Sequence, residues 1–146
     1  MKTIKEISSI ETYSVRHPVL REGKSIDSCK FEGDDLESTI HIGLYINAAL
    51  VGVVSVFENS NSFFDSKKQF QVRGMAVLKH HQKMGYGEEL LFEAENHSVK
   101  YFGDLIWFNA RENAVGFYEK KGYQICGDSF IIENIGKHFV LYKKLN

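Results

Sequence analysis

The feature that most limits how this chain can fold is a junction between a predicted strand and a long predicted helix. Residues 70–78 (FQVRGMAVL) are typical of a central strand, and residues 85–102 place apolar side chains at helical spacing. Gly85 and Gly87 lie at the start of this helix, with acidic residues in its first turn. Closely spaced glycines at a helix N-terminus leave main-chain N–H groups pointing outward, as in phosphate-binding loops. The junction therefore predicts an anion site beside a sheet that carries helices.

The other predicted elements continue this mixture of strands and helices along the chain. We expect further strands at 3–7, 40–46, 50–57, 105–110, 123–132 and 137–145. Residues alternate over 40–47 with isoleucine or leucine at every second position, which predicts that the strand at 40–46 buries one face. A capping box at Ser8–Glu11 precedes a helix that runs to Leu20, which Pro18 should kink or end. Residues 21–36 should form an irregular surface loop, and Asn113 should cap a short helix over 113–121. The order predicts an α/β (α+β) fold, a mixed sheet with helices on its faces.

Length and composition fit a single domain covering residues 1–146. The chain has 43% hydrophobic and 25% charged residues, enough for a core without disulfides. A formal net charge of -1 argues against a nucleic-acid or polybasic membrane surface. Cys29 and Cys126 fit neither a disulfide framework nor a zinc motif, so we expect no metal. Without an apolar run long enough for a signal peptide or a membrane span, we expect a cytoplasmic protein.

Two common phosphate-binding motifs do not fit the junction. A dinucleotide-binding fingerprint needs a third glycine where this chain has Leu90, and a P-loop needs Gly-Lys-Ser/Thr. The spacing Gln82-x-x-Gly85-x-Gly87 after a strand instead resembles the acetyl-CoA motif Q/R-x-x-G-x-G/A of the GNAT (N-acetyltransferase) superfamily. Lysines and histidines at positions 79–83 add positive charge beside this loop.

A second stretch also resembles this superfamily. Residues 109–123 (NARENAVGFYEKKGY) look like its signature N-x-x-A-x-x-F-Y-x-x-x-G-F/Y. Phe117-Tyr118 and Gly122-Tyr123 occupy the aromatic and glycine places of that signature. On its own, the aromatic pair is also typical of a protein core. Two motifs in the right order and spacing favour the resemblance.

The resemblance implies a cofactor site that can be stated residue by residue. In this superfamily acetyl-CoA lies between two parallel central strands that splay apart, here residues 70–78 and 105–110. Gly74 would supply a bulge in the first strand, and Asn113 would add a hydrogen bond near the pantetheine. Main-chain groups that would pair with the pantetheine amides belong to Met75, Ala76 and Val77. The diphosphate would be held by the loop residues Gln82, Lys83, Met84, Gly85, Tyr86, Gly87 and Glu88.

The resemblance also implies direct transfer of the acetyl group to a primary amine of a small molecule or peptide. Tyr118 matches the position that contacts the cofactor and commonly protonates the departing thiolate. The general base stays open among Glu58, His41, His138 and ordered water. We favour His138, because it begins the final predicted strand near where the family places acceptors.

Acceptor selection and two rival functions also stay open. The segment 16–35 should border the acceptor cavity. Its charged side chains either select a charged acceptor or are solvated, and Arg73 either faces the acceptor or pairs with a neighbouring carboxylate. These charged residues of the segment are Arg16, Arg21, Glu32, Asp34 and Asp35. The rivals are an acyltransferase that uses another acyl-CoA and a non-catalytic CoA-binding or regulatory domain. The sequence does not decide between a monomer and a homodimer.

Overall fold

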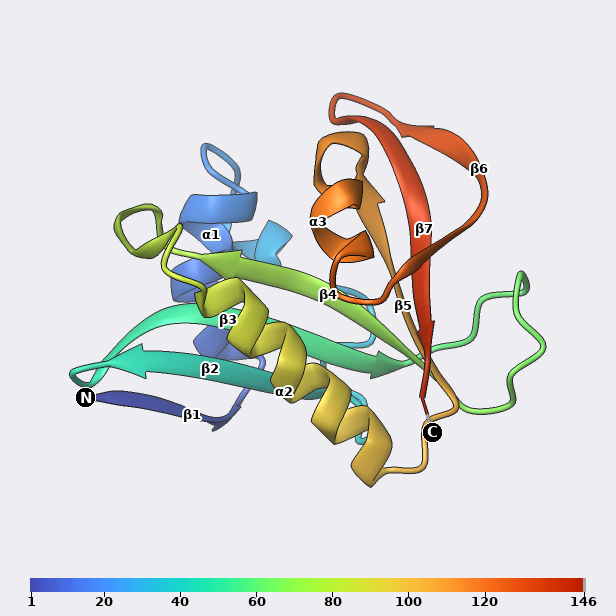
Figure 1. Cartoon of the computed structure of the whole chain (residues 1–146). Helices are drawn as coiled ribbons and strands as arrows, with labels where there is room; N and C mark the ends of the chain where they lie inside the picture. Colours follow the sequence, from blue (N-terminus) through green and yellow to red (C-terminus); the bar gives the residue numbers. More distant parts are fainter. Residues whose placement is uncertain (146) are drawn as a thin grey trace. The chain divides into compact units, whose positions relative to one another are not determined.

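The computed structural model describes residues 1–145 and has the predicted order of strands and helices (Figure 1). Its strands are β1 (Lys2–Ile7), β2 (Ile40–Ile46), β3 (Ala49–Glu58), β4 (Gln69–Val77), β5 (Leu105–Arg111), β6 (Gln124–Ile132) and β7 (Gly136–Lys144). Its α-helices are α1 (Tyr13–Leu20), α2 (Tyr86–Lys100) and α3 (Val115–Glu119), and short 3-10 turns lie between elements. The predicted α/β (α+β) class is confirmed.

The strands form a mixed sheet in the order β1-β2-β3-β4-β5-β7-β6. The first strands and the last strands pair antiparallel with their neighbours. The central pair is parallel, with residues 69–71 of β4 opposite residues 105–107 of β5. A parallel pair needs a crossover connection, which α2 supplies here.

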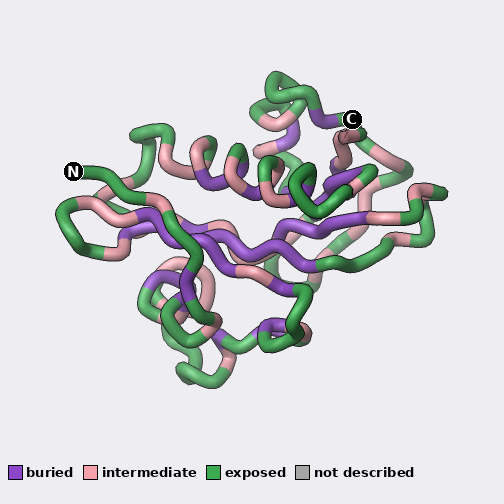
Figure 2. Tube along the Cα trace, turned by 90° about the horizontal axis from the view of Figure 1, so that it is seen from below, coloured by how far each residue is buried: buried purple, intermediate pink, exposed green. Residues whose placement is uncertain are grey.

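The chain forms two compact units, and the prediction of one domain over 1–146 stays a prediction. The first unit contains residues 1–58 and 72–97, and the second contains residues 59–71 and 98 onward. In the first unit, Val53 of β3 shares a core cluster with Val15 of α1. A Cβ built on the neighbouring Gly52 would lie 3.0 Å from Leu90 of α2, so the two helices cover opposite faces. Figure 2 shows the resulting buried runs along the strands.

The second unit packs its sheet between α3 and the loop 59–68. Phe108 of β5 contacts Tyr118 of α3, with ring centroids 4.7 Å apart. On the other face, Trp107 joins a cluster that includes Phe64 of the loop, and its Nε1 donates to the Asn59 carbonyl at 2.9 Å. No helix among residues 1–145 has the length and apolar content needed to cross a membrane.

Local sequence signals place most element ends correctly. In the predicted capping box, the Ser8 amide donates to Glu11 Oε1 at 2.9 Å and the Glu11 amide to Ser8 Oγ at 3.3 Å. The helix that follows begins with a 3-10 turn and continues two residues past Pro18, to Leu20. The turn at Asn47 and Ala48 has positive φ at both residues, as a tight hairpin requires.

Three predictions about local structure are wrong. The segment 21–36 is not merely a surface loop, because Cys29, Phe31 and Asp34 are buried in it. Strand β2 is buried on both faces over residues 41–44 rather than on one. Asn113 does not cap a helix: residues 112–114 form a 3-10 turn, and α3 begins after Ala114 without a side-chain cap.

Candidate active site

The loop that follows β4 has the backbone shape that its glycines predicted. Gln82 Nε2 donates to the Val77 carbonyl at 2.9 Å, so this side chain ties the loop to the end of the strand. Lys83 and Gly85 have φ values of +65° and +83°, in the left-handed region. A Cβ at Gly85 would meet no atom within 4 Å, so the space in front of this main chain is open.

The main-chain N–H groups at this loop are available to a ligand. Within residues 1–145, no acceptor is recorded for the N–H groups of residues 83–87. The Glu89 amide donates to the Gly85 carbonyl at 3.2 Å, as expected one turn into a helix. The Glu89 carboxylate is held by Lys2, which leaves less negative charge at the N-terminus of α2. Open amides and the positive end of the helix dipole together form an anion site.

The exposed side chains around the loop add positive charge. Lys79, His80 and Lys83 are exposed, whereas His81 is half-buried with its ring 6.5 Å from that of Tyr86. Met84, also predicted in the loop, is exposed, and Glu88 lies in the first turn of α2. All the residues predicted to hold a diphosphate are therefore brought together in one segment.

Gly74 changes which way β4 presents its side chains. Its φ is +66°, and a Cβ built there would lie 2.9 Å from the nearest aromatic carbon. On β3, Val53 and Phe57 are four residues apart and face the same side. Ala76 shares a core cluster with Val53, and the Arg73 guanidinium lies 5.4 Å from the Phe57 ring. Arg73 and Ala76 therefore share a face, although three residues of regular strand would place them on opposite faces.

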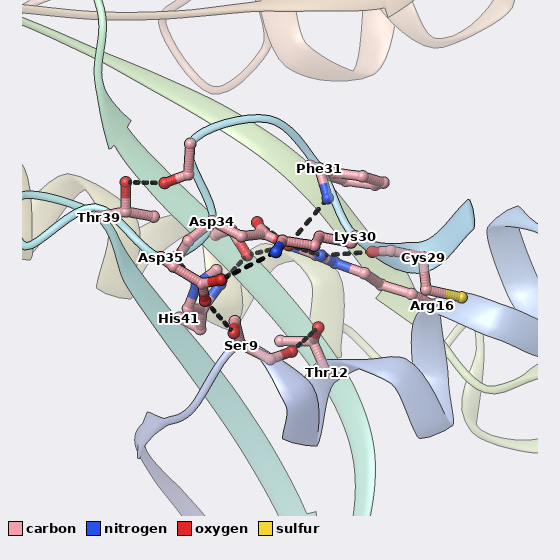
Figure 3. A network of polar contacts seen from close by, with 12 residues as sticks. Ser9, Thr12, Arg16, Cys29, Lys30, Phe31, Asp34, Asp35, Thr39 and His41 are labelled. Atoms are coloured by element: carbon pink, nitrogen blue, oxygen red, sulfur yellow. Dashed lines mark hydrogen bonds and ion pairs between the residues drawn. The ribbon is translucent and has the colours of Figure 1, made fainter. Parts of the chain in front are cut away.

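Arg16 of α1 is fully buried at the centre of a polar network (Figure 3). Its two terminal nitrogens donate to the two carboxylate oxygens of Asp34 at 2.6 and 3.1 Å. They also donate to the Cys29 carbonyl at 2.7 Å and to Ser55 Oγ at 2.9 Å. Because both charges are fully buried, the pair neutralises itself, and it joins α1, the loop 21–36 and β3.

His41, one of the predicted candidates for the general base, belongs to this network instead. It is 4% exposed, with Nδ1 2.6 Å from Ser55 Oγ and Nε2 2.9 Å from the Asp34 carbonyl. A carbonyl only accepts, so Nε2 carries the proton and Nδ1 accepts from the Ser55 hydroxyl. Both ring nitrogens are therefore occupied by structural hydrogen bonds. Ser55, the one polar residue in the run VGVVSVF, was the sequence signal for this network.

Tyr118 lies in α3 of the second unit among aromatic rings. Its ring is 4.7 Å from that of Phe108, 5.2 Å from Phe117 and 6.3 Å from Tyr123. Burial raises the pKa of the Tyr118 hydroxyl above its ordinary value of 10.0. The hydroxyl therefore stays protonated at neutral pH, as a proton donor must.

His138 lies in β7 and is also buried, at 6% exposure. Its Nδ1 is 2.8 Å from the Gly136 carbonyl and so carries the proton, which leaves Nε2 as an acceptor in the neutral ring. His138 is opposite Arg111 of β5, and directly paired residues share a face. Arg111 is three residues from Phe108, the partner of Tyr118, so Tyr118 and His138 lie on opposite faces of this sheet.

The remaining predicted residues are on the surface or at the edge of elements. Asn113 is exposed in its 3-10 turn, and Arg111 rather than Asn113 stands three residues before Ala114, where the quoted signature has its asparagine. Glu58 is the exposed last residue of β3. Among residues 1–145, the structure contains no group of three His, Cys, Asp or Glu side chains that could hold a metal ion.

Comparison with known proteins identifies the family. The family model of the acetyltransferase (GNAT) domain matches residues 27–145. The chain belongs to the GNAT acetyltransferase family. It is also 33% identical over 145 residues to the uncharacterized N-acetyltransferase YitI of Bacillus subtilis, covering 99% of this chain and 97% of that protein. The chain is therefore a GNAT N-acetyltransferase, and the predicted resemblance is confirmed.

Solved structures agree with this fold. The ribosomal-protein-S18-alanine N-acetyltransferase of Escherichia coli superposes with a TM-score of 0.76 at 15% identity, over 100% of this chain and 95% of that one. A Bacillus subtilis acetyltransferase in complex with CoA superposes with a TM-score of 0.69 at 17% identity, over 99% of this chain and 98% of that one. At these identities the likeness shows the GNAT fold, whereas the acceptor of this GNAT chain has to be argued from its own residues.

Proposed function

We propose that this GNAT protein transfers the acetyl group of acetyl-CoA directly to a primary amine of a small molecule or peptide in the cytoplasm. The observation that carries the proposal is the row of main-chain N–H groups at residues 83–87, for which no acceptor is recorded within residues 1–145. These donors lie at the N-terminus of a 15-residue helix and suit the diphosphate of coenzyme A. The CoA complex of the Bacillus subtilis acetyltransferase supports the same cofactor.

The chain's own groups supply the chemistry of direct transfer in this proposal. The amine must first lose a proton, because only the neutral nitrogen attacks the thioester carbon. A C–N bond then forms, and the carbonyl oxygen becomes an oxyanion that a main-chain N–H near Ala76 or Val77 stabilises. When the C–S bond breaks, the Tyr118 hydroxyl gives its proton to the thiolate. The proton of the amine goes to ordered water or to Glu58, or it reaches His138 through water, because His138 lies on the face of the sheet opposite Tyr118.

Coenzyme A binding tests the cofactor part of the proposal. Asn and Asp both tolerate a left-handed backbone, so Gly85→Asn and Gly85→Asp should fold and differ chiefly in charge. Placed beside the diphosphate, the Asp carboxylate should cost about 1–3 kcal/mol, which is roughly a 5- to 150-fold loss of affinity relative to Gly85→Asn. Isothermal titration calorimetry with coenzyme A measures this difference.

Gly23→Asp is the matched control for this experiment. Gly23 has a φ of +79° and nothing within 4 Å of a built Cβ, so it repeats the backbone setting of Gly85 away from the loop. It should bind coenzyme A like the unmodified protein. Equal affinities for all the variants would refute the loop as the diphosphate site. Binding of coenzyme A without thiol release on any amine would instead favour a non-catalytic domain, and faster turnover with another thioester would favour another acyl group.

A further inference from the structure

Three guanidinium groups surround the ring of Phe31 in the first unit. The guanidinium carbons of Arg16, Arg21 and Arg73 lie 3.9, 5.0 and 4.9 Å from its centroid. Each cation is attracted to the ring face, but like charges this close repel one another. The cluster therefore needs negative charge, and Phe31 itself is only 7% exposed.

The carboxylates near the ring do not balance these cations. Asp34 is fully buried and gives both of its oxygens to Arg16. Arg21 donates to two main-chain carbonyls, at 3.0 and 3.2 Å, which carry no net charge. The Asp35 carboxylate forms an ion pair with Lys30, whose Nζ lies 3.3 Å from Oδ2. The Arg16–Asp34 pair cancels, and the exposed Glu32 carboxylate acts on Arg73 electrostatically without a recorded ion pair. Three guanidinium groups against the two carboxylates of Asp34 and Glu32 leave the cluster with one net positive charge.

Arg73 is the most available member of the cluster. Within residues 1–145, its recorded contacts are the Phe31 and Phe57 rings, and no hydrogen bond or ion pair is recorded for its guanidinium. Arg73 is half-buried, and burial is the main cause that lowers its pKa. The negative charges of Asp34 and Glu32 raise this pKa, and the positive charges of Arg16 and Arg21 lower it. Arginine still stays protonated in proteins, so this is a partly desolvated cation whose donors are unused.

We propose that Arg73, with Arg21 beside it, binds a carboxylate of the acceptor, so that the acceptor is an amine that also carries a carboxylate. The planar guanidinium fork matches a carboxylate with two parallel hydrogen bonds, and the two aromatic rings hold its orientation. This inference rests on the proposed function. It adds the class of acceptor: amino acids, or peptides with a free C-terminus.

The position of Arg73 on β4 supports this role. It lies two residues before Met75, where the proposed pantetheine contacts begin, and two residues of strand span roughly 6–7 Å. Gly74 turns Arg73 and Ala76 to the same face of the first unit. An acceptor that presents its amine near Ala76 would place a carboxylate several ångströms away along β4, toward Arg73.

Matched pairs of acceptors test the proposal by thiol release at saturating acetyl-CoA. Dipeptides and their C-terminal amides have the same amine, far enough from the carboxyl end that its pKa changes little. The free acids should have kcat/KM values about tenfold or more above the amides, as expected for a charge-assisted bidentate contact. Arg73→Gln should reduce the ratio of kcat/KM for free acid to kcat/KM for amide to about one. Arg73→Lys should restore part of the preference.

Control experiments distinguish a failure of this inference from a failure of the proposed function. Lys24→Gln removes an exposed charge from the same loop and should keep the preference. If Arg73→Gln does not fold, Arg21→Gln should still narrow the acid-over-amide ratio. Equal rates for acids and amides in the unmodified protein, or an unchanged ratio in Arg73→Gln, would overturn the inference while the proposed function stands. Absence of both coenzyme A binding and thiol release would overturn the proposed function itself.

Discussion

Tyr118 and His138 lie on opposite faces of the sheet in the second unit. Tyr118 contacts Phe108, while His138 pairs with Arg111 three residues further along the same strand. A group bound on one face meets only one of the two directly. The proposed acid and the favoured base therefore need separate tests.

Replacing Tyr118 with Phe should slow the reaction while cofactor affinity stays within about twofold. The ring and its contacts with Phe108 and Tyr123 remain, so only the proton donor is lost. We expect kcat to fall roughly 100-fold, the lower end for general acid catalysis. Thiol-release kinetics and calorimetry with coenzyme A measure the two quantities. An unaltered kcat removes Tyr118 from the acid role.

The pH dependence of kcat should also reflect Tyr118. An acid acts only in its protonated form, so its contribution is lost as the pH rises through its pKa. Burial raises that pKa above its ordinary value of 10.0, and the midpoint of the loss should therefore lie above pH 10. A pH–rate profile with an amine that is already neutral at pH 9 checks this. A decline near pH 8 that Tyr118→Phe abolishes contradicts the assignment.

His138→Ala tests the base. If Nε2 takes the proton from the amine, kcat/KM of the variant should fall roughly 100-fold. The Nδ1 hydrogen bond to the Gly136 carbonyl fixes the tautomer that such a base needs. A variant whose kcat/KM matches that of the unmodified protein assigns the proton to water or Glu58 instead.

Asp34→Ala should destabilise the protein by about 3–5 kcal/mol, because it leaves the Arg16 charge buried without its partner. Asp35→Ala is the matched comparison: its ion pair with Lys30 is more than 60% exposed on both sides and should be worth less than about 1 kcal/mol. Urea unfolding measures both free energies. Equal losses would show that the buried pair is no more important than the surface one.

Gly74→Ala should both destabilise β4 and disturb Arg73. The new Cβ needs a left-handed backbone and meets Phe31 at 2.9 Å, a combined cost of about 2–3 kcal/mol. Gly23→Ala has the same strain with no contact and should cost about 1 kcal/mol. The difference between the two unfolding free energies isolates the contact. If they match, Gly74 is required for its φ alone.

Local patterns predicted the strands, the capping box and the conformation of the glycine-containing loop after β4, because each depends on residues close in sequence. The side chain of Gln82 donates a hydrogen bond to the carbonyl of Val77, which is only five residues earlier in the sequence. The conformation of this loop therefore depends on residues within the motif and the end of the strand that precedes it. The spacing of its glycines also predicted the GNAT family, which the family model over residues 27–145 confirms.

The buried polar network could not be predicted in this way. Arg16, Asp34 and Ser55 belong to three separate segments, and a polar stretch such as 21–36 normally remains solvated. The composition of residues 21–36 does not show that Asp34 pairs with Arg16, because Arg16 belongs to α1. For a related reason, the sequence did not predict that Tyr118 and His138 lie on opposite faces of the sheet. Their placement depends on the register of the strands and not on the order of the residues along the chain.

The buried Arg16 also bears on which positions of the loop 21–36 tolerate substitution. It fixes the loop at Cys29 and Asp34, while the side chains of residues 22–27 are exposed. Because the contact of His17 in this stretch is to the Lys24 main-chain carbonyl, exchanges of the exposed side chains leave it in place. Variation confined to these side chains would therefore alter the surface of the loop while Phe31 keeps its position.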